Sequence, residues 1–200
     1  MDVRRLPLAM AAAWVARVSY TGDLGYEIWC DPAVQLHLFE TIMREGSELG
    51  LLLFGTRALN SLRLEKAYGS WAREYRPIYG PFEAGLDRFV DFKKSHFIGR
   101  SAAAEEKESG GALRLVTFKV DATDADAIGD EPIWHDGKAV GWVTSGAFGH
   151  RVNHSLALGY VPAVQAAADA GFEIEIIGER HKAHRLAGAS FDPAGGLMRT

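Results

Sequence analysis

The apolar residues in the first half of this chain follow a mixture of strand and helix periods. Trp14–Tyr20 and Tyr26–Trp29 predict two strands that flank a turn. A helix is expected to begin at Asp31, a good N-cap residue that is followed by proline, and to end at Gly50. Further helices are predicted from Thr56 and over Ala102–Lys107. Strands and helices in this mixed order indicate an α+β arrangement.

Beyond Gly111 the apolar residues repeat with a period of two. Asp136-Gly137 lies between two such runs and is typical of a tight β-hairpin turn. Short strands at nearly regular spacing indicate a small antiparallel barrel or sandwich. The strands are predicted at Leu113–Val120, Pro132–His135, Lys138–Val143, Leu156–Val161, Phe172–Ile176 and His181–Leu186.

This change of period divides the chain. We predict two domains, residues 1–108 and 112–200, joined by the glycine-containing linker Glu108–Ala112. The expected fold class is α+β, with a ferredoxin-like α/β sandwich portion followed by a small antiparallel β-barrel.

Composition and charge exclude several classes of protein. The chain has 200 residues, 22 basic against 26 acidic, and a formal net charge of −4, so no basic surface is expected for nucleic acid or anionic lipid. A single cysteine, Cys30, excludes an internal disulfide and a cysteine-built metal site.

No apolar run approaches the roughly 20 residues that cross a bilayer. The basic residues before the first apolar stretch resemble a signal peptide, but Trp14 and Arg17 leave no cleavage region, and we expect a cytoplasmic protein.

Motifs for nucleotide or metal chemistry are missing from the sequence. It contains no P-loop, no G-x-G-x-x-G and no H-E-x-x-H. His181 and His184 are spaced to point to opposite faces of a strand. His150 and His154 lie in a predicted loop with no third ligand nearby. We therefore expect no metal site, and Cys30 is expected to be an inert packing residue.

The segment between the first two predicted strands has an unusual pattern. Gly22 and Gly25 indicate a tight turn or a close approach of the backbone to a ligand. Glu27 interrupts an otherwise apolar strand, and the pattern alone favours a side chain that points outward to water over one buried with donors. Arg57 stands near the start of a predicted helix, where it opposes the helix dipole. This position is compatible with an anionic partner, but a solvent-exposed arginine remains the default interpretation.

Five short motifs occur in order over residues 17–161. They are Arg17–Ile28, Gly55–Lys66, Phe97–Arg100, Val143–Gly146 and Leu156–Val161. Together they resemble motifs of the glycine cleavage T-protein (aminomethyltransferase) family. Further segments are most similar to the C-terminal part of dimethylglycine and sarcosine dehydrogenases, in which a T-protein-like module follows an FAD-dependent one. These segments are Glu65–Trp71, Gly149–Val152 and Phe191–Pro193.

The resemblance implies a binding site for tetrahydrofolate. Glu27 matches the family's pterin-binding glutamate, which reverses the outward interpretation given by the pattern alone. Tyr20 matches a pocket tyrosine, and Arg57 matches a pocket arginine that holds a carboxylate of the folate tail or of the substrate. The family's catalytic aspartate lies in a long segment ahead of the first motif, so no catalytic residue is expected in this chain. Because no flavin-binding fingerprint is present, FAD is expected only on a separate or missing upstream module.

We therefore expect a tetrahydrofolate-binding C-terminal module of an aminomethyltransferase-type enzyme. In the intact system it would transfer a methylene unit from a small amine donor to tetrahydrofolate. The expected partners are folate, a small amine, and an upstream flavoprotein module or a missing N-terminal segment. The alternatives are a non-catalytic folate-binding or regulatory module and a structural remnant with an open pocket.

Overall fold

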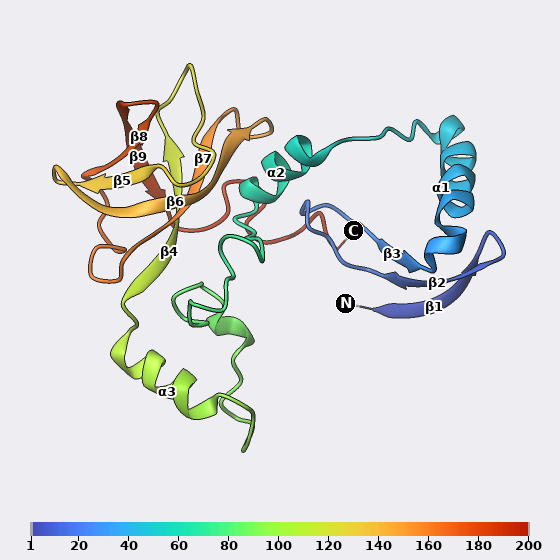
Figure 1. Cartoon of the computed structure of the whole chain (residues 1–200), viewed down its shortest axis with the longest axis horizontal. Coiled ribbons are helices and arrows are strands. Elements are labelled where there is room, and N and C mark those ends of the chain that lie inside the picture. Colours follow the sequence, from blue (N-terminus) through green and yellow to red (C-terminus); the bar gives the residue numbers. More distant parts are fainter. Residues whose placement is uncertain (1, 200) are drawn as a thin grey trace. The chain divides into compact units, whose positions relative to one another are not determined.

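The computed structural model describes residues 2–199, which form two compact units. One unit consists of residues 2–62 and 194–199, and the other of Arg63–Pro193. The first contains a three-stranded sheet and the second a closed barrel (Figure 1). These elements confirm the predicted α+β class with a small C-terminal barrel.

The first unit is built on an antiparallel sheet in which β2 lies between β1 and β3. β1 (Val3–Leu8) and β2 (Ala11–Ala16) form a hairpin whose turn residues, Ala9 and Met10, both have positive φ. β3 (Glu27–Cys30) pairs with the other edge of β2. The sequence pattern does not predict β1, and it places the next strand over Trp14–Tyr20, whereas the structure ends that strand at Ala16. The difference arises because Arg17 and the residues after it already belong to the loop.

α1 (Pro32–Gly46) begins where its capping residue predicts. Asp31 has an extended backbone, with φ −62° and ψ 136°, and its side chain accepts a hydrogen bond from the backbone N–H of Ala33 at 2.8 Å. The short 3₁₀ helix η1 (Ser47–Leu49) follows, and Gly50 ends it in the left-handed region at φ 75°. The predicted helical stretch from Asp31 to Gly50 is confirmed.

Two further helices confirm the predicted positions. α2 (Thr56–Glu65) begins in the first unit and ends in the second. α3 (Arg100–Ser109) ends at Gly110, whose φ of 83° is left-handed. Residues 66–99 between them form turns around the short 3₁₀ helix η2 (Asp87–Phe89).

The barrel of the second unit has the strand order β4-β7-β6-β5-β8-β9. β4 pairs with both β7 and β9, which closes the barrel. Asp136 and Gly137 turn from β5 into β6 with φ of 51° and 79°, the left-handed pair that the hairpin prediction requires. The strands are β4 (Leu113–Val120), β5 (Pro132–His135), β6 (Lys138–Gly149), β7 (His154–Pro162), β8 (Phe172–Ile176) and β9 (Glu179–Leu186).

Apolar side chains from all parts of the barrel form its core. Phe118, Ile133 and Ile174 belong to the main cluster and are fully buried. A smaller cluster joins Leu64 of α2 to Leu156 and Leu158 of β7. The last turn of α2 is therefore part of the packing of the barrel.

The predicted linker Glu108–Ala112 lies inside the second compact unit, and a carboxylate holds its end. Glu83 accepts hydrogen bonds from the backbone N–H groups of Ala112 at 2.9 Å and Leu113 at 3.0 Å. A third bond comes from the N–H of Gly80 at 3.2 Å. The division into domains 1–108 and 112–200 stays a prediction. In the structure, residues 63–193 form one compact unit that includes the linker.

The hydrogen bonds to Glu83 lower the pKa of its carboxyl. Burial acts in the opposite direction and raises the pKa, but the N–H groups of Leu113, Gly80 and Ala112 and the charge of Arg114 together outweigh it. A carboxyl whose pKa is lowered by folding stabilises the folded state above its unfolded-state pKa. That stabilisation is lost as the pH falls through the folded-state pKa.

We expect Glu83→Gln to lower the free energy of unfolding at pH 7. We also expect this free energy to depend less on pH below about 4.3, the pKa of an unperturbed glutamate, because glutamine does not titrate. Urea denaturation at a series of pH values measures both effects. Glu105→Gln, an exposed position of α3, is the matched control and should behave as the wild type does. The same pH dependence in Glu83→Gln and the wild type would contradict this account.

Candidate functional site

The motif Arg17–Ile28 forms the loop after β2 and the start of β3. Ser19 Oγ accepts a hydrogen bond from the N–H of Gly22 at 3.0 Å, and Gly22 has a left-handed φ of 85°. A Cβ atom at Gly25 would lie 3.2 Å from the carbonyl oxygen of Val18. The loop itself therefore explains both glycines, which supports the tight-turn alternative. Tyr20 lies in this loop and is half-buried.

Glu27 is the first residue of β3 and is exposed. Its cross-strand partner on β2 is Ala16, whose methyl side chain cannot form a hydrogen bond with the Glu27 carboxylate. Because side chains alternate along a strand, Glu27 shares its face of the sheet with Trp29 and with the cross-strand partner of Trp29, Trp14. Glu27 was predicted from the sequence as a site residue, and neither tryptophan was.

Arg57 is the second residue of α2 and is exposed. The first turn of this helix contains no acidic residue, so nothing within it offsets the unfavourable position of a cation at a helix N-terminus. Tyr20, Glu27 and Arg57 thus lie in one compact unit but on a loop, a strand and a helix. Their shared role in folate binding stays a prediction.

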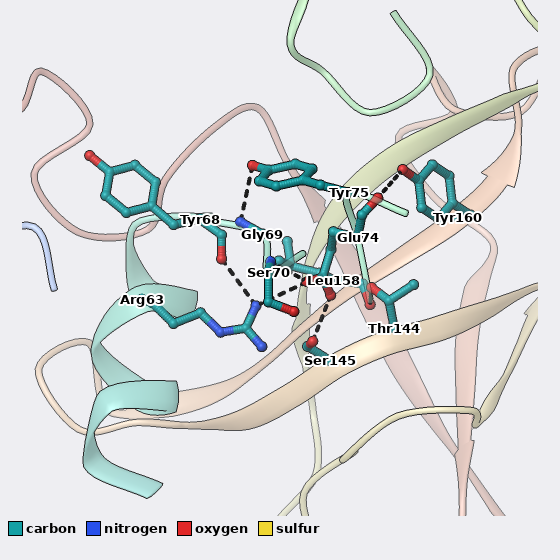
Figure 2. A network of polar contacts seen from close by, with 10 residues as sticks. All are labelled: Arg63, Tyr68, Gly69, Ser70, Glu74, Tyr75, Thr144, Ser145, Leu158 and Tyr160. Atoms are coloured by element: carbon teal, nitrogen blue, oxygen red, sulfur yellow. Dashed lines mark hydrogen bonds and ion pairs between the residues drawn. The ribbon is translucent and has the colours of Figure 1, made fainter. Parts of the chain in front are cut away.

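A buried polar network in the second unit ties the segment after α2 to the barrel (Figure 2). Glu74 is fully buried, and its carboxylate accepts hydrogen bonds from Ser145 Oγ of β6 at 2.6 Å and from the backbone N–H of Ser70 at 2.7 Å. Arg63 Nη1 lies 3.4 Å from the same carboxylate and donates to the carbonyl oxygen of Tyr68 at 3.0 Å. The two charges are therefore paired and hydrogen-bonded, as buried charges require.

Tyr160 of β7 supplies a second attachment at the same place. Its hydroxyl donates to the carbonyl oxygen of Glu74 at 2.7 Å, and its ring stacks on Tyr79 at a centroid distance of 3.9 Å. Burial raises the pKa of Tyr160 far above its usual value, so the hydroxyl keeps its proton and remains a donor at neutral pH.

The residues that end the Gly55–Lys66 motif are also buried and paired. Glu65 Oε1 accepts the backbone N–H of Arg151 at 2.7 Å, and Lys66 Nζ lies 3.2 Å from Asp192 Oδ2. The backbone N–H of Phe191 donates to the carbonyl oxygen of Glu65 at 2.9 Å. The end of α2 therefore holds both the turn after β6 and the segment near the C-terminus.

Several of the motifs behind the resemblance thus contact one another in the second unit. The end of α2 pairs with Arg151 of the Gly149–Val152 motif and with Asp192 of the Phe191–Pro193 motif, while Ser145 of Val143–Gly146 joins through Glu74. None of these structural roles was predicted from the sequence. These roles could have been inferred from the end of the predicted helix, where Arg63 and Glu65 alternate with leucines.

Two of the four histidines considered as metal ligands have polar partners from distant parts of the sequence. His184 Nε2 lies 2.8 Å from Asp121 Oδ2, and His154 Nε2 lies 3.1 Å from Ser190 Oγ. Within residues 2–199, no group of three or more histidine, cysteine or acidic side chains is arranged to hold a metal ion. In the same range no helix has the length and apolar character that crossing a membrane needs. A cavity of about 560 Å³ opens beside the end of β4, but Tyr20, Glu27 and Arg57 do not line it.

Comparison with known proteins agrees with the motifs. Residues 1–94 match the model of the GCVT N-terminal domain, and residues 114–192 match the model of the glycine cleavage T-protein C-terminal barrel domain. The chain belongs to the glycine cleavage T-protein family, which includes the aminomethyltransferases. The resemblance inferred from the motifs is confirmed.

Relatives of two kinds are similar to this T-protein family member. Human mitochondrial dimethylglycine dehydrogenase is 37% identical over 184 residues, which cover 92% of this chain and 21% of that protein. An aminomethyltransferase of Halothermothrix orenii is 36% identical over 151 residues, which cover 76% of this chain and 42% of that protein. The crystal structure of the glycine cleavage system aminomethyltransferase T from Bartonella henselae matches with a TM-score of 0.79 at 25% identity, covering 90% of this chain and 50% of that one. The chain therefore spans half or less of each of these relatives.

We expect Glu74→Ala to lower the free energy of unfolding by about 3–5 kcal/mol, because it leaves the Arg63 guanidinium buried without its carboxylate. Glu45→Ala on α1 is the control, since it removes one side of an exposed ion pair with Arg44 and should cost less than about 1 kcal/mol. Urea denaturation at pH 7 measures both losses. Equal losses in the two variants would contradict the role given to Glu74.

Proposed function

We propose that this chain binds tetrahydrofolate as the folate-binding module of an aminomethyltransferase-type enzyme. In that enzyme a methylene unit passes from a small amine donor to tetrahydrofolate. The observation that carries the proposal is the position of Glu27 in a member of this family. It is an exposed carboxylate at the start of β3, with only an alanine opposite it.

The chemistry of these residues fits a folate. A pterin ring presents adjacent N–H donors, and one carboxylate accepts two of them in bidentate fashion. Glu27 has both oxygens available for such a pair, because its carboxylate forms no hydrogen bond or ion pair with a residue in the range 2–199. Its place on a strand with hydrogen-bonded neighbours limits its movement, which favours an oriented acceptor.

Arg57 and Tyr20 supply complementary groups. The guanidinium of Arg57 is exposed, and its planar fork suits a carboxylate of the folate tail or of the amine substrate. Tyr20 offers an aromatic face and a hydroxyl from the half-buried loop. An acceptor for the ring and a cation for the tail are the two requirements for holding a folate at both ends.

The role proposed for this chain is binding and orientation. Bound tetrahydrofolate supplies the nitrogen that takes up the one-carbon unit. Glu27 holds the pterin end, and Arg57 offsets the negative charge of the tail. We assign no catalytic residue to this chain, and we assign FAD to a separate flavoprotein module that would act as its partner. Relatives named for dimethylglycine and sarcosine support a small methylated amine as the donor, and a cytoplasmic location stays a prediction.

We expect the wild-type chain to bind tetrahydrofolate saturably in isothermal titration calorimetry. Glu27→Gln should weaken binding at least about tenfold, equivalent to about 1.4 kcal/mol, because an amide replaces one acceptor oxygen with a donor. Arg57→Ala should lower the affinity for tetrahydrofolate. It should leave the affinity for tetrahydropterin unchanged, because tetrahydropterin lacks the tail. Glu40→Gln, an exposed position on α1, is the control. Absence of saturable binding would overturn the function, and unchanged affinity of Glu27→Gln would overturn the role of Glu27.

A transfer assay separates an enzyme module from a purely binding one. Formation of methylenetetrahydrofolate from the amine and tetrahydrofolate is followed with the chain alone, with a flavin-dependent amine dehydrogenase alone, and with both proteins. We expect no product with the chain alone, and faster formation with both proteins than with the dehydrogenase alone. Saturable binding without this acceleration would favour the alternative, a non-catalytic folate-binding module. Turnover by the chain alone would show that it contains a catalytic residue that we have not assigned.

A further inference from the structure

One end of the barrel opens into the cavity of about 560 Å³. Its walls come from the ends of β4, β6 and β7, which contribute Val120, Phe148 and Ser155. The loop after β4 covers the cavity, and Ala122 and Ala125 of this loop pack against the apolar core of the barrel. Both alanines have small side chains, so the loop covers the end of the barrel without filling it. The mouth of a β-barrel is a common place for a small-molecule site.

A buried hydroxyl group in this cavity has no partner within the described part of the chain. Ser155 is 1% exposed, and its Oγ forms no hydrogen bond with any residue in the range 2–199. Ser155 is the cross-strand partner of both Val120 and Phe148, so its side chain points to the same side of the sheet as theirs, into the end of the barrel. A buried hydroxyl without a hydrogen bond is unfavourable. A molecule that enters the cavity and bonds to Ser155 Oγ would remove this cost.

The rim of the cavity is acidic. His184 Nε2 lies 2.8 Å from the carboxylate of Asp121, and Asp124 accepts a hydrogen bond from the hydroxyl of Thr123 at 2.7 Å. The carboxylate of Asp126 is half-buried and forms no hydrogen bond or ion pair with a residue in the range 2–199. The charged residues that line the cavity are Asp121, Asp124, Asp126 and Lys119. Because no group of acidic and histidine side chains in this range is arranged to hold a metal ion, the excess of negative charge suits an organic cation.

We propose that this cavity is a binding site for a small protonated alkylamine. The carboxylate of Asp126 pairs with the ammonium group, and Phe148 and Val120 contact the alkyl groups. Ser155 Oγ forms a hydrogen bond with a hydroxyl or N–H group further along the molecule. A carboxylate beside an aromatic ring is a favourable environment for an alkylammonium ion. The proposal does not rest on the folate site, because the residues assigned to that site belong to the first unit and do not line the cavity.

Titration with dimethylaminoethanol tests the site. At neutral pH this probe is a cation with two methyl groups and a hydroxyl, and isoamyl alcohol has the same shape without the charge. In NMR spectra of the full chain, dimethylaminoethanol is expected to shift the resonances of Val120, Ala122 and Ser155 saturably. Isoamyl alcohol and the anion isovalerate should bind at least about tenfold more weakly, because neither pairs with a carboxylate.

Two conservative variants test the two polar contacts. Asp126→Asn should lower the affinity for dimethylaminoethanol at least about tenfold, because it removes the charge. Ser155→Ala should lower this affinity at least about threefold, and it should not lower the melting temperature of the ligand-free chain, because the hydroxyl that it removes has no partner. Asp169→Asn is the control, since Asp169 is an exposed residue of the second unit that does not line the cavity.

Four results would overturn the proposal. They are no saturable shift with dimethylaminoethanol, equal affinity for isoamyl alcohol, unchanged affinity of a folded Asp126→Asn chain, and a lower melting temperature of Ser155→Ala with unchanged affinity. The last result would show that the hydroxyl serves the fold. Circular dichroism shows whether each variant is folded, and the comparison of the three probes on the wild-type chain decides the proposal even if a variant does not fold.

Discussion

Glu74 is fully buried, and the hydrogen bonds that satisfy its carboxylate come from β6 and from the backbone of its own segment, with Arg63 beside them. A buried charge without partners costs several kcal/mol, so residues 63–75 are stable in the arrangement that brings these groups together. Tyr160 adds a bond to the carbonyl oxygen of the same residue. Glu74 therefore contributes one attachment between the segment after α2 and the barrel, and the packing of Leu64 and the contacts of Glu65 and Lys66 contribute others.

The two units of the chain are stabilised in different ways. The barrel closes on itself through β4 and β9 and contains large apolar side chains such as Phe118 and Ile133. The first unit has a sheet with one helical layer and leaves two tryptophans on the other face. The same difference separates their sequences, since β8 of the barrel alternates regularly between buried and half-buried residues whereas the first unit contains long apolar runs.

The family motifs include two kinds of residue, which resemblance alone does not separate. Arg63, Glu65 and Lys66 are buried and paired with partners inside the chain, so their chemistry is used by the fold. Glu27 and Arg57 are exposed, so their charges are available to a ligand. In the loop before β3, Gly22 and Gly25 are required by the backbone itself. Burial therefore distinguishes the structural part of each motif from the part that remains for binding.

The sequence by itself determined the elements whose cause is local. The cap at Asp31, the turn at Asp136-Gly137 and the period of two beyond Gly111 each act over a few residues, and they predicted α1, the β5–β6 hairpin and the barrel strands. β1 was not predicted, because its strand character depends on pairing with β2. Only the tertiary structure decided which polar groups meet, since Glu74 and Ser145 are 71 residues apart and Lys66 and Asp192 are 126 residues apart. The exposure of Trp14 and Trp29 likewise depends on which face of the sheet α1 covers, because the apolar pattern of a strand does not show whether a partner layer is present.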